Sequence, residues 1–389
     1  MSVIKNEIKK IFNITNLIII GIVTSLIWIL FINFEIEDFP KDRPQREIHK
    51  DFVYMLKKYG TEVDKEEFED YKKIRDERIK KANDYLSSNE EYVKHGLGNY
   101  ENLKSNKPKD YKEGGYSYDP KRREELKEKI LFEDNTDIFW EIEATYSIIE
   151  DYEETVYIDD KNIDLFNDDQ INRFLEFQNR TKPNSTISSI AHGNYSTLIE
   201  SINKLIVISI FIMISPIFIK DNKNKVNYLQ YSSKVGREIL NKKIISGIIS
   251  SILIITLQLI IFFVIYKQNN TFMFWDCNIN SLFNGVHWYD MTFGQYIILT
   301  VIQTYILGIV SAIISMFVST RVNTYISLIG IQIPILFIFY KIINRYNAGY
   351  LTAVYEPKYL LYVLYIGLVV ISVLLIYMMI KREKKLHLK

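Results

Sequence analysis

The stretch IISGIISSILIITLQLIIFFVIY, residues 244–266, has 23 residues and no charged side chain. About 20 consecutive apolar residues in a helix cross the hydrocarbon core of a bilayer. Backbone polar groups find no water in that core, so the segment must bond them internally, as a helix does. The stretch therefore predicts a membrane-spanning helix.

Five other runs have the same character. They are residues 14–34, 205–219 with an extension back to about Tyr195, 293–318, 325–343 and 359–380. The first run is longer than the apolar core of a signal peptide and no small-residue cleavage site follows it, so we expect it to remain as a span. The predicted fold class is mainly α: a polytopic six-helix membrane domain with a mostly α-helical extracytoplasmic domain between spans 1 and 2.

The net charge of +1 over 389 residues hides two opposite regions. Residues 34–202 contain 40 acidic and 27 basic side chains, whereas the rest of the chain contains 7 acidic and 21 basic ones. The basic groups outside the acidic block cluster in residues 5–10, 220–243 and 381–389. Short cytoplasmic segments carry the excess of lysine and arginine, and six spans put all three clusters on one side. We expect both termini inside and the acidic block outside.

These patterns divide the chain into seven segments. They are an amphipathic interfacial helix (1–12), the first span (13–34), an extracytoplasmic helical domain (35–194), the second span (195–220), a basic cytoplasmic loop (221–243), spans 3 to 6 (244–380) and a basic cytoplasmic tail (381–389). The first helix is expected because Ile4, Ile8 and Ile11 share one face, with lysines on the other.

The acidic block has helical periodicity and almost no strand-like alternation. Helices are expected at residues 47–59, 64–86, 122–132, 138–152 and 168–179, a loop at 107–120 and one short strand-like piece at 155–158. The loop contains Gly114 and Gly115 between two prolines, a composition typical of turns. The block is long enough to fold as a domain.

Nothing in the chain predicts catalysis. The carboxylate pair Glu141 and Glu143 has no distinguishing geometry, and acid-rich helices always contain such pairs. The five histidines lack the HExxH spacing of zinc enzymes, and no G-x-x-x-x-G-K-[ST] phosphate loop is present. The single cysteine, Cys277, excludes an internal disulfide. We expect no enzyme activity, no metal site, no cofactor in this chain and no nucleic-acid partner.

The predicted spans contain only mild polar residues such as Gln258, Gln303 and Gln332. Interhelical hydrogen bonds explain side chains of this kind without a transport role. Proton- and ion-coupled carriers use intramembrane charges, so such a carrier is disfavoured and energy for transport must come from elsewhere. Pro216 and Pro334 are expected to kink their helices.

The loop after the second span, FIKDNKNKVNYLQYSSKVGREILNKK (218–243), resembles the first cytoplasmic loop of permeases from two-component bacterial ABC exporters. Those loops carry an acidic residue just past the span, a short helix, a serine-rich turn, a Gly-Arg or Ser-Arg pair and a lysine. The matching positions are Asp221, residues 226–231, Ser232 with Ser233, Gly236 with Arg237, and Lys242 or Lys243. Lys225 departs from the pattern, because many relatives have glycine there. The layout, with a large insertion between spans 1 and 2, is also similar.

The resemblance implies a coupling helix that fits a groove on a separate ATPase subunit. Two permeases, here expected to be two copies of this chain, pair with two ATPases, and those partners bind ATP and Mg²⁺. The residues that it assigns to the ATPase contact are Asp221, Lys225, Tyr228, Leu229, Tyr231, Ser232, Ser233, Gly236 and Arg237. Their chemistry suits a joint: Gly236 permits close approach, and Arg237 can bind a carboxylate with two hydrogen bonds. Topology alone requires only positive charge.

The resemblance further implies export or clearance of an amphipathic substrate, such as an antimicrobial peptide, a bacteriocin or a lipid, across a bacterial plasma membrane. A second hypothesis is a non-transporting sensor or scaffold whose extracytoplasmic domain binds a ligand. A third is an ABC permease of the sodium-extrusion type, which ranks last because intramembrane carboxylates are nearly absent.

Overall fold

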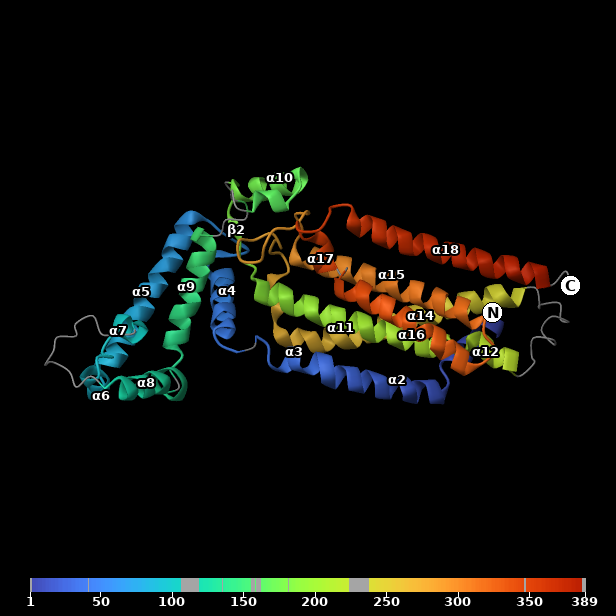
Figure 1. Cartoon of the computed structure of the whole chain (residues 1–389), viewed down its shortest axis with the longest axis horizontal. Helices are drawn as coiled ribbons and strands as arrows, with labels where there is room; N and C mark the ends of the chain where they lie inside the picture. The colour runs from blue at the N-terminus through green and yellow to red at the C-terminus, as the bar shows by residue number, and fades with distance from the viewer. Residues whose placement is uncertain are drawn as a thin grey trace.

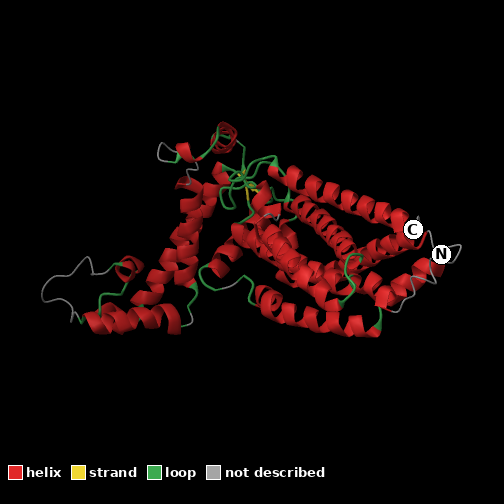
Figure 2. Ribbon diagram, turned by 45° about the vertical axis from the view of Figure 1, so that its right-hand side comes forward, coloured by secondary structure: helices red, strands yellow, loops and turns green. Residues whose placement is uncertain are grey.

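The computed structural model describes residues 2–40, 42–105, 119–134, 136–154, 158, 162–180, 182–223, 238–345 and 348–386. A bundle of long helices forms one half of the elongated molecule, and a group of shorter helices projects from one end of it (Figure 1). Both termini lie at the opposite end of the bundle, which we call the inner end (Figure 1). The predicted fold class is confirmed: the described chain is mainly helical (Figure 2).

Among the described residues, six helices are long and apolar enough to cross a membrane. The first span comprises α2 (Ile14–Ile27), a π-helical turn η1 (Trp28–Ile32) and α3 (Asn33–Glu37); the others are α11 (Ser189–Ile214) continuing into α12 (Pro216–Lys223), α14 (Ile239–Tyr266), α15 (Phe293–Ser319), α16 (Tyr325–Arg345) and α18 (Leu360–Leu386). Every predicted span is therefore present as a helix.

Two spans begin earlier than the apolar runs predicted. The helix α11 starts at Ser189 and α14 at Ile239. An apolar run marks only the part of a helix that lies in hydrocarbon. The helix itself can continue beyond that part, where polar side chains are tolerated. Pro216 interrupts the second span as expected, since α11 ends at Ile214 and α12 begins at Pro216. In contrast, α16 runs unbroken through Pro334.

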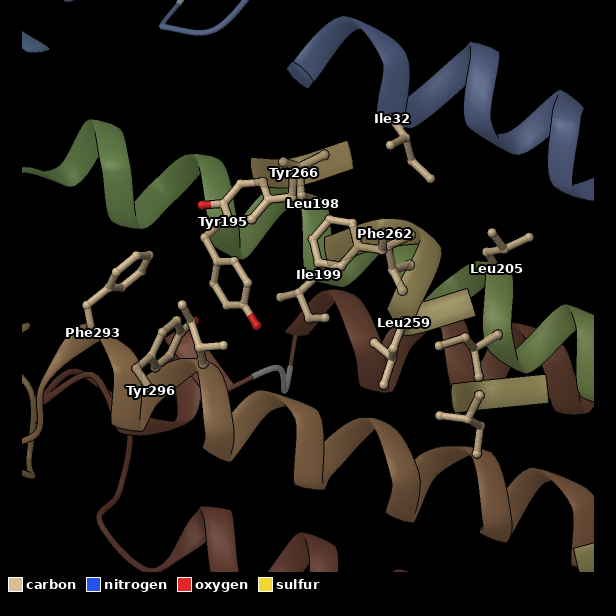
Figure 3. Close-up of a cluster of buried hydrophobic side chains, with 14 of the residues drawn as sticks. Ile32, Tyr195, Leu198, Ile199, Leu205, Leu259, Phe262, Tyr266, Phe293 and Tyr296 are labelled. Atoms are coloured by element: carbon tan, nitrogen blue, oxygen red, sulfur yellow. The ribbon is translucent and has the colours of Figure 1, made fainter. Parts of the chain in front are cut away.

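The helix α11 is the hub of the bundle. It packs against α2, α14, α15 and α16, and 78% of the apolar window in the second span is buried, against 6% in the first. At its outer end Tyr195 meets the rings of Tyr266 and Tyr296 (Figure 3). The helices approach closely at Gly308, where a Cβ atom would lie 2.5 Å from Cδ1 of Ile255.

The predicted N-terminal helix is present as α1 (Ser2–Ile11). It packs against α14 and α12 at the inner end of the bundle. Ile11 is buried, and the Ser246 hydroxyl of α14 donates a hydrogen bond of 3.4 Å to the Ile4 carbonyl. This first helix is thus tied to the spans.

The projecting part consists of short helices. They are α4 (Gln45–Tyr59), α5 (Lys65–Ser87), α6 (Glu90–Lys94), α7 (Tyr100–Lys104), α8 (Pro120–Glu128), the π-helical turn η2 (Lys129–Glu133), α9 (Ile138–Glu154), the 3-10 turn η3 (Ile163–Leu165) and α10 (Asp168–Gln178). The helix α5 begins as the sequence predicts, because Asp64 and Glu67 form a reciprocal capping box. The predicted loop at 107–120 and the strand-like piece at 155–158 fall almost wholly outside the described residues.

A buried ion pair joins α4, α5 and α9. The Arg78 guanidinium donates two hydrogen bonds of 2.6 Å, one to each carboxylate oxygen of Asp51. Tyr71 donates to the same carboxylate over 2.7 Å, and Thr145 of α9 contacts it at 3.5 Å. Burial and the charge of Asp51 raise the pKa of Tyr71 well above its ordinary value, so the phenol stays a donor. We call Asp51, Tyr71, Arg78 and Thr145 the outer joint.

The projecting helices are fastened to the bundle. The strands β1 (Glu62–Val63) and β2 (Asn184–Ser185) pair antiparallel, with Val63 opposite Asn184. The segment between α14 and α15, which includes the 3-10 turns η5 (Lys267–Asn269) and η6 (Thr271–Phe274), folds over the ends of the spans together with α17 (Ala348–Thr352). Phe283 of this cap packs on Phe52 and Phe68 of the outer helices. One apolar cluster therefore continues from the bundle into α4 and α5.

Candidate functional site

A buried ion cluster holds the inner end of the bundle together. Asp221 of α12 accepts hydrogen bonds from Lys10 of α1 at 3.2 Å and lies 2.7 Å from Nζ of Lys243 on α14. Asp221 and Lys243 are 4% and 3% exposed, which is rare for charged side chains unless they are paired. Lys10 also binds Glu7 at 2.7 Å. We call Glu7, Lys10, Asp221 and Lys243 the inner joint.

The charges of the inner joint reinforce one another. Burial by itself lowers the pKa of Lys10, but the hydrogen bond and charge of Glu7 and the charge of Asp221 outweigh it, so this pKa lies above its ordinary value. The Lys243 ammonium group also lies over the ring of Phe218, 5.0 Å from its centroid. The contacts of Glu7 and Asp221 keep Lys10 charged, and the cluster connects α1, α12 and α14.

The inner joint includes one residue of the predicted ATPase contact. Asp221 is the acidic residue just past the second span, and the structure places it inside the chain's own ion cluster. The other predicted contact residues lie outside the described part of the chain: Lys225, Tyr228, Leu229, Tyr231, Ser232, Ser233, Gly236 and Arg237. Sequence reasoning did not pair Asp221 with Lys10, which is 211 positions away. Of the two lysines that matched the family pattern, Lys243 binds Asp221, whereas Lys242 binds Glu238.

A polar node marks the interruption of the second span. The Ser215 hydroxyl contacts the Ser315 hydroxyl at 2.7 Å and accepts a hydrogen bond from the Gln332 side chain. The Ser319 hydroxyl donates to the Ser215 carbonyl over 2.6 Å. Pro216 has no N–H to donate to the preceding turn, and side chains of α15 and α16 form hydrogen bonds with Ser215 beside this gap in the helix ladder.

A groove runs along this polar node. It encloses about 620 Å³ between α2, α11 and α16, and its walls are mainly isoleucine, leucine, methionine and phenylalanine side chains. Its polar lining residues are Lys10, Asn13, Thr15, Asn16, Ser215, Gln332 and Tyr325. Asn13 caps α2 through a hydrogen bond of 3.1 Å from the Asn16 amide. The groove is therefore apolar along its walls and polar at its inner end and midway.

A second hollow of about 280 Å³ continues the groove toward the outer end. Ile208, Ile333 and Leu336 line both hollows. The outer hollow is apolar except for Lys204, which binds Glu200 one turn away at 2.7 Å and lies 4.9 Å from the Tyr340 ring centroid. Side chains of α11 point toward its N-terminus, so this pair reaches toward the outer end. The sequence reading passed over it because one pair of charges barely lowers the hydropathy of so long a run.

The combined groove suits an elongated amphipathic molecule. Apolar walls bind hydrocarbon or aromatic groups, and polar groups at separate depths bind a head group or peptide units. Across the described residues, no three His, Cys, Asp or Glu side chains gather in a way that could hold a metal ion. Comparison of the sequence and the structure with protein-family models, curated proteins and solved structures finds no match.

Proposed function

We propose that the chain is the membrane subunit of an ATP-driven exporter, working as a dimer with separate ATPase subunits that bind ATP and Mg²⁺. The observation that carries this proposal is the inner joint. Asp221 lies at the end of α12, next to the predicted coupling segment, and it is bound to Lys10, which also lines the groove. A displacement of the coupling segment is therefore transmitted to the groove wall through an ion pair.

The interrupted second span supports such a movement. The helix ladder lacks the hydrogen bond that the Pro216 nitrogen cannot donate, and the contacts around this junction come from side chains that can rotate. A short helix joined to a long one at a proline can change its angle without unfolding either. In this proposal α12 moves with the ATPase while α11 stays fixed in the bundle.

The groove supports an amphipathic cargo. Its polar residues lie at the inner end, at the node and at Lys204, so a bound molecule meets polar groups at three depths. An antimicrobial peptide, a bacteriocin or a lipid has the matching alternation of apolar and polar groups. Export or clearance of such a compound is the proposed task.

We place the second copy of the chain against the first and fifth spans, because these two spans flank the groove. Large apolar side chains on them are uncovered, including Ile14, Ile18 and Ile22 of α2, and Ile326 and Phe337 of α16. These helices flank the mouth of the groove. A second copy of the chain packed here would close the groove into a path between two subunits.

The coupling segment is the place to test this function. Gentle solubilisation and affinity capture of the full chain are expected to recover an ATPase subunit, with ATP hydrolysis in the same fraction. The double substitution Gly236→Val with Arg237→Glu should remove both. Arg321→Ala, which removes a cation at the inner end of α15, is the matched control and should leave both unchanged.

Two results would contradict the proposal. One is capture under gentle conditions without any nucleotide-binding partner. The other is unchanged ATPase capture and ATP hydrolysis after residues 225–237 are replaced by a scrambled segment with the same number of lysines and arginines. The second result would favour the sensor or scaffold hypothesis, which needs only the charge of this loop.

A further inference from the structure

The helix α10 and the turn before it extend sideways from the outer end of the bundle. In Figures 1 and 2, α10 lies over the cap at the outer end of the bundle, to one side of it and apart from the outer helices α5 to α9. This element belongs to the insertion between spans 1 and 2, yet it packs on the caps that precede spans 4 and 6. This position raises the question of where α10 lies relative to the outer membrane interface.

Specific hydrogen bonds fix the level of α10 against the bundle. The Gln170 side chain donates to the Val354 carbonyl over 2.7 Å, and Gln170 is buried. Arg173 donates to the His287 carbonyl over 3.0 Å and binds the Asp290 carboxylate at 2.8 Å. The helix is thus held rigidly at the height of residues 286–290 and 354.

Aromatic side chains place that height at the beginning of the last span. Phe166 and Phe174 lie 5.9 Å and 5.5 Å from the ring of Tyr355. Tyr289 lies 6.2 Å from Tyr362, the third residue of α18, which is 53% exposed on a span surface. Tyr355 and Tyr359 are exposed as well. Tyrosines gather at the boundary between hydrocarbon and water, so this band marks the outer interface.

Apolar side chains are exposed on this element, close to the contact of Phe166 with Tyr355. Leu165, next to Phe166, is 77% exposed, and Ile163 and Leu175 are more than one-third exposed. A fully exposed leucine is ordinary on a soluble surface. Here it adjoins a rigid helix beside a band of tyrosines, and this band is continuous with the lipid-facing surface of α18.

We propose that the turn Ile163–Phe166 and the apolar edge of α10 insert into the head-group region of the outer leaflet. The insertion between spans 1 and 2 then contacts the membrane at a second place, laterally displaced from the bundle. Apolar burial drives the contact, because Asp164, Asp168, Asp169 and Glu176 outnumber Arg173 in this element and give no attraction to anionic lipid. This inference does not depend on the proposed export function.

Site-specific fluorescence tests this contact in the full chain, reconstituted in phosphatidylcholine nanodiscs. An environment-sensitive dye is attached at Leu165→Cys, at Tyr359→Cys as the interfacial reference and at Glu124→Cys on α8 as the aqueous reference. The native Cys277 is buried, and labelling of the unmodified chain measures its background. Spin-labelled lipid with the quencher near the head group is expected to quench residue 165 within about twofold of residue 359 and to leave residue 124 unaffected.

Two further measurements make the result decisive. Quenching at residue 165 should persist at high salt, because salt screens charge attraction and not apolar insertion. With the dye at Leu175→Cys, the double substitution Ile163→Asp and Leu165→Asp should reduce quenching to the level of residue 124. Emission and quenching at residue 165 that match residue 124 would overturn the proposal, and so would quenching that disappears at high salt.

Discussion

The outer joint and the inner joint each bury a carboxylate of nearly equal exposure, but they hold it in different ways. Asp51 receives both arms of one arginine and a tyrosine hydroxyl, so its position is determined by a planar fork. Asp221 is held by two lysines from two helices, each a single charge on a flexible stem. The outer helices therefore form a rigid body, whereas the inner joint can keep its attraction while its helices shift.

Removal of the outer carboxylate should have the largest effect. Asp51→Ala removes both short hydrogen bonds from the largely buried Arg78 and leaves it only Glu141, at 3.7 Å, as a charge partner. Breaking a buried pair in this way costs about 3–5 kcal/mol. Hydrogen exchange of α5 amides should show this loss of local stability. Asp76→Ala on the exposed side of α5 is the control, with an expected change within about 0.5 kcal/mol. Equal effects of the two substitutions would show that the fork does not hold α4 to α5.

Acid should weaken the outer helices next most strongly. His49 of α4 is buried beside Phe39 and Phe274, and burial lowers its pKa to about 4. In the unfolded chain the His49 imidazole binds a proton at about pH 6.5, whereas in the folded chain it does so only near pH 4. The free energy of unfolding is therefore highest above pH 6.5 and falls as the pH drops toward 4, by up to about 3 kcal/mol. The measurement is hydrogen exchange of α4 against pH.

A matched substitution isolates this titration. His49→Phe keeps an aromatic ring between Phe39 and Phe274 and should remove most of the pH dependence of α4. His287 in the cap also has a lowered pKa, about 3, because of burial, and its contribution remains in the variant. Unchanged pH dependence in His49→Phe would assign the acid sensitivity to another group.

Removal of the inner carboxylate should have a smaller and local effect. Asp221→Ala removes a partner from two lysines, but Lys10 keeps Glu7 at 2.7 Å, and the long stem of Lys243 can bring its charge back to water. We expect a loss of about 1–3 kcal/mol, the range for hydrogen bonds to charged groups, seen as faster hydrogen exchange in α1 and α12 and no change in α5. Glu238→Ala, an exposed inner-end carboxylate that binds Lys242, should change neither. Destabilisation as large as that of Asp51→Ala would contradict the difference drawn between the joints.

Removing the interruption of the second span by Pro216→Ala should have the smallest effect on stability. Pro216 is the first residue of α12, where the missing N–H is tolerated, so Pro216→Ala should change stability by less than about 1 kcal/mol. It allows α11 and α12 to form one continuous ladder, and hydrogen exchange at residues 215–219 should slow. Export should fall in parallel, whereas Pro357→Ala in the outer cap is expected to leave both unchanged. Full export together with slowed hydrogen exchange would show that the break at Pro216 is not needed for export.

The spans could be predicted because hydrocarbon imposes one rule on every segment that crosses it. All six lie within a few residues of the apolar runs, except where α11 and α14 continue among polar neighbours. The helical periodicity predicted the start of α5 to within one residue, and the capping box of Asp64 and Glu67 that fixes this start is a local interaction. These features depend on residues close together in the sequence.

The joints could not be predicted, because they depend on residues far apart. Nothing near Asp221 indicates that Lys10 reaches it, and Asp51 can pair with Arg78 only because α4 and α5 both pack against α9. The structured cap between α14 and α15 was not predicted. Its Ser281 hydroxyl donates a hydrogen bond of 2.8 Å to the Ser185 carbonyl of β2 and accepts one from the Asn184 side chain of β2. Polar residues of this kind look alike in a loop and in a structured cap.

The two-residue pairing of β1 with β2 has a consequence for the modularity of the protein. It brings Val63 beside Asn184, so the long excursion between them leaves and returns at one point. A short turn grafted there would delete α5 to α10 while keeping α4 and the whole bundle, and a foreign domain with adjacent termini would fit the same splice. In such a variant the spans keep their path, whereas α4 and Phe283 lose the apolar cover that Phe68 of α5 supplies.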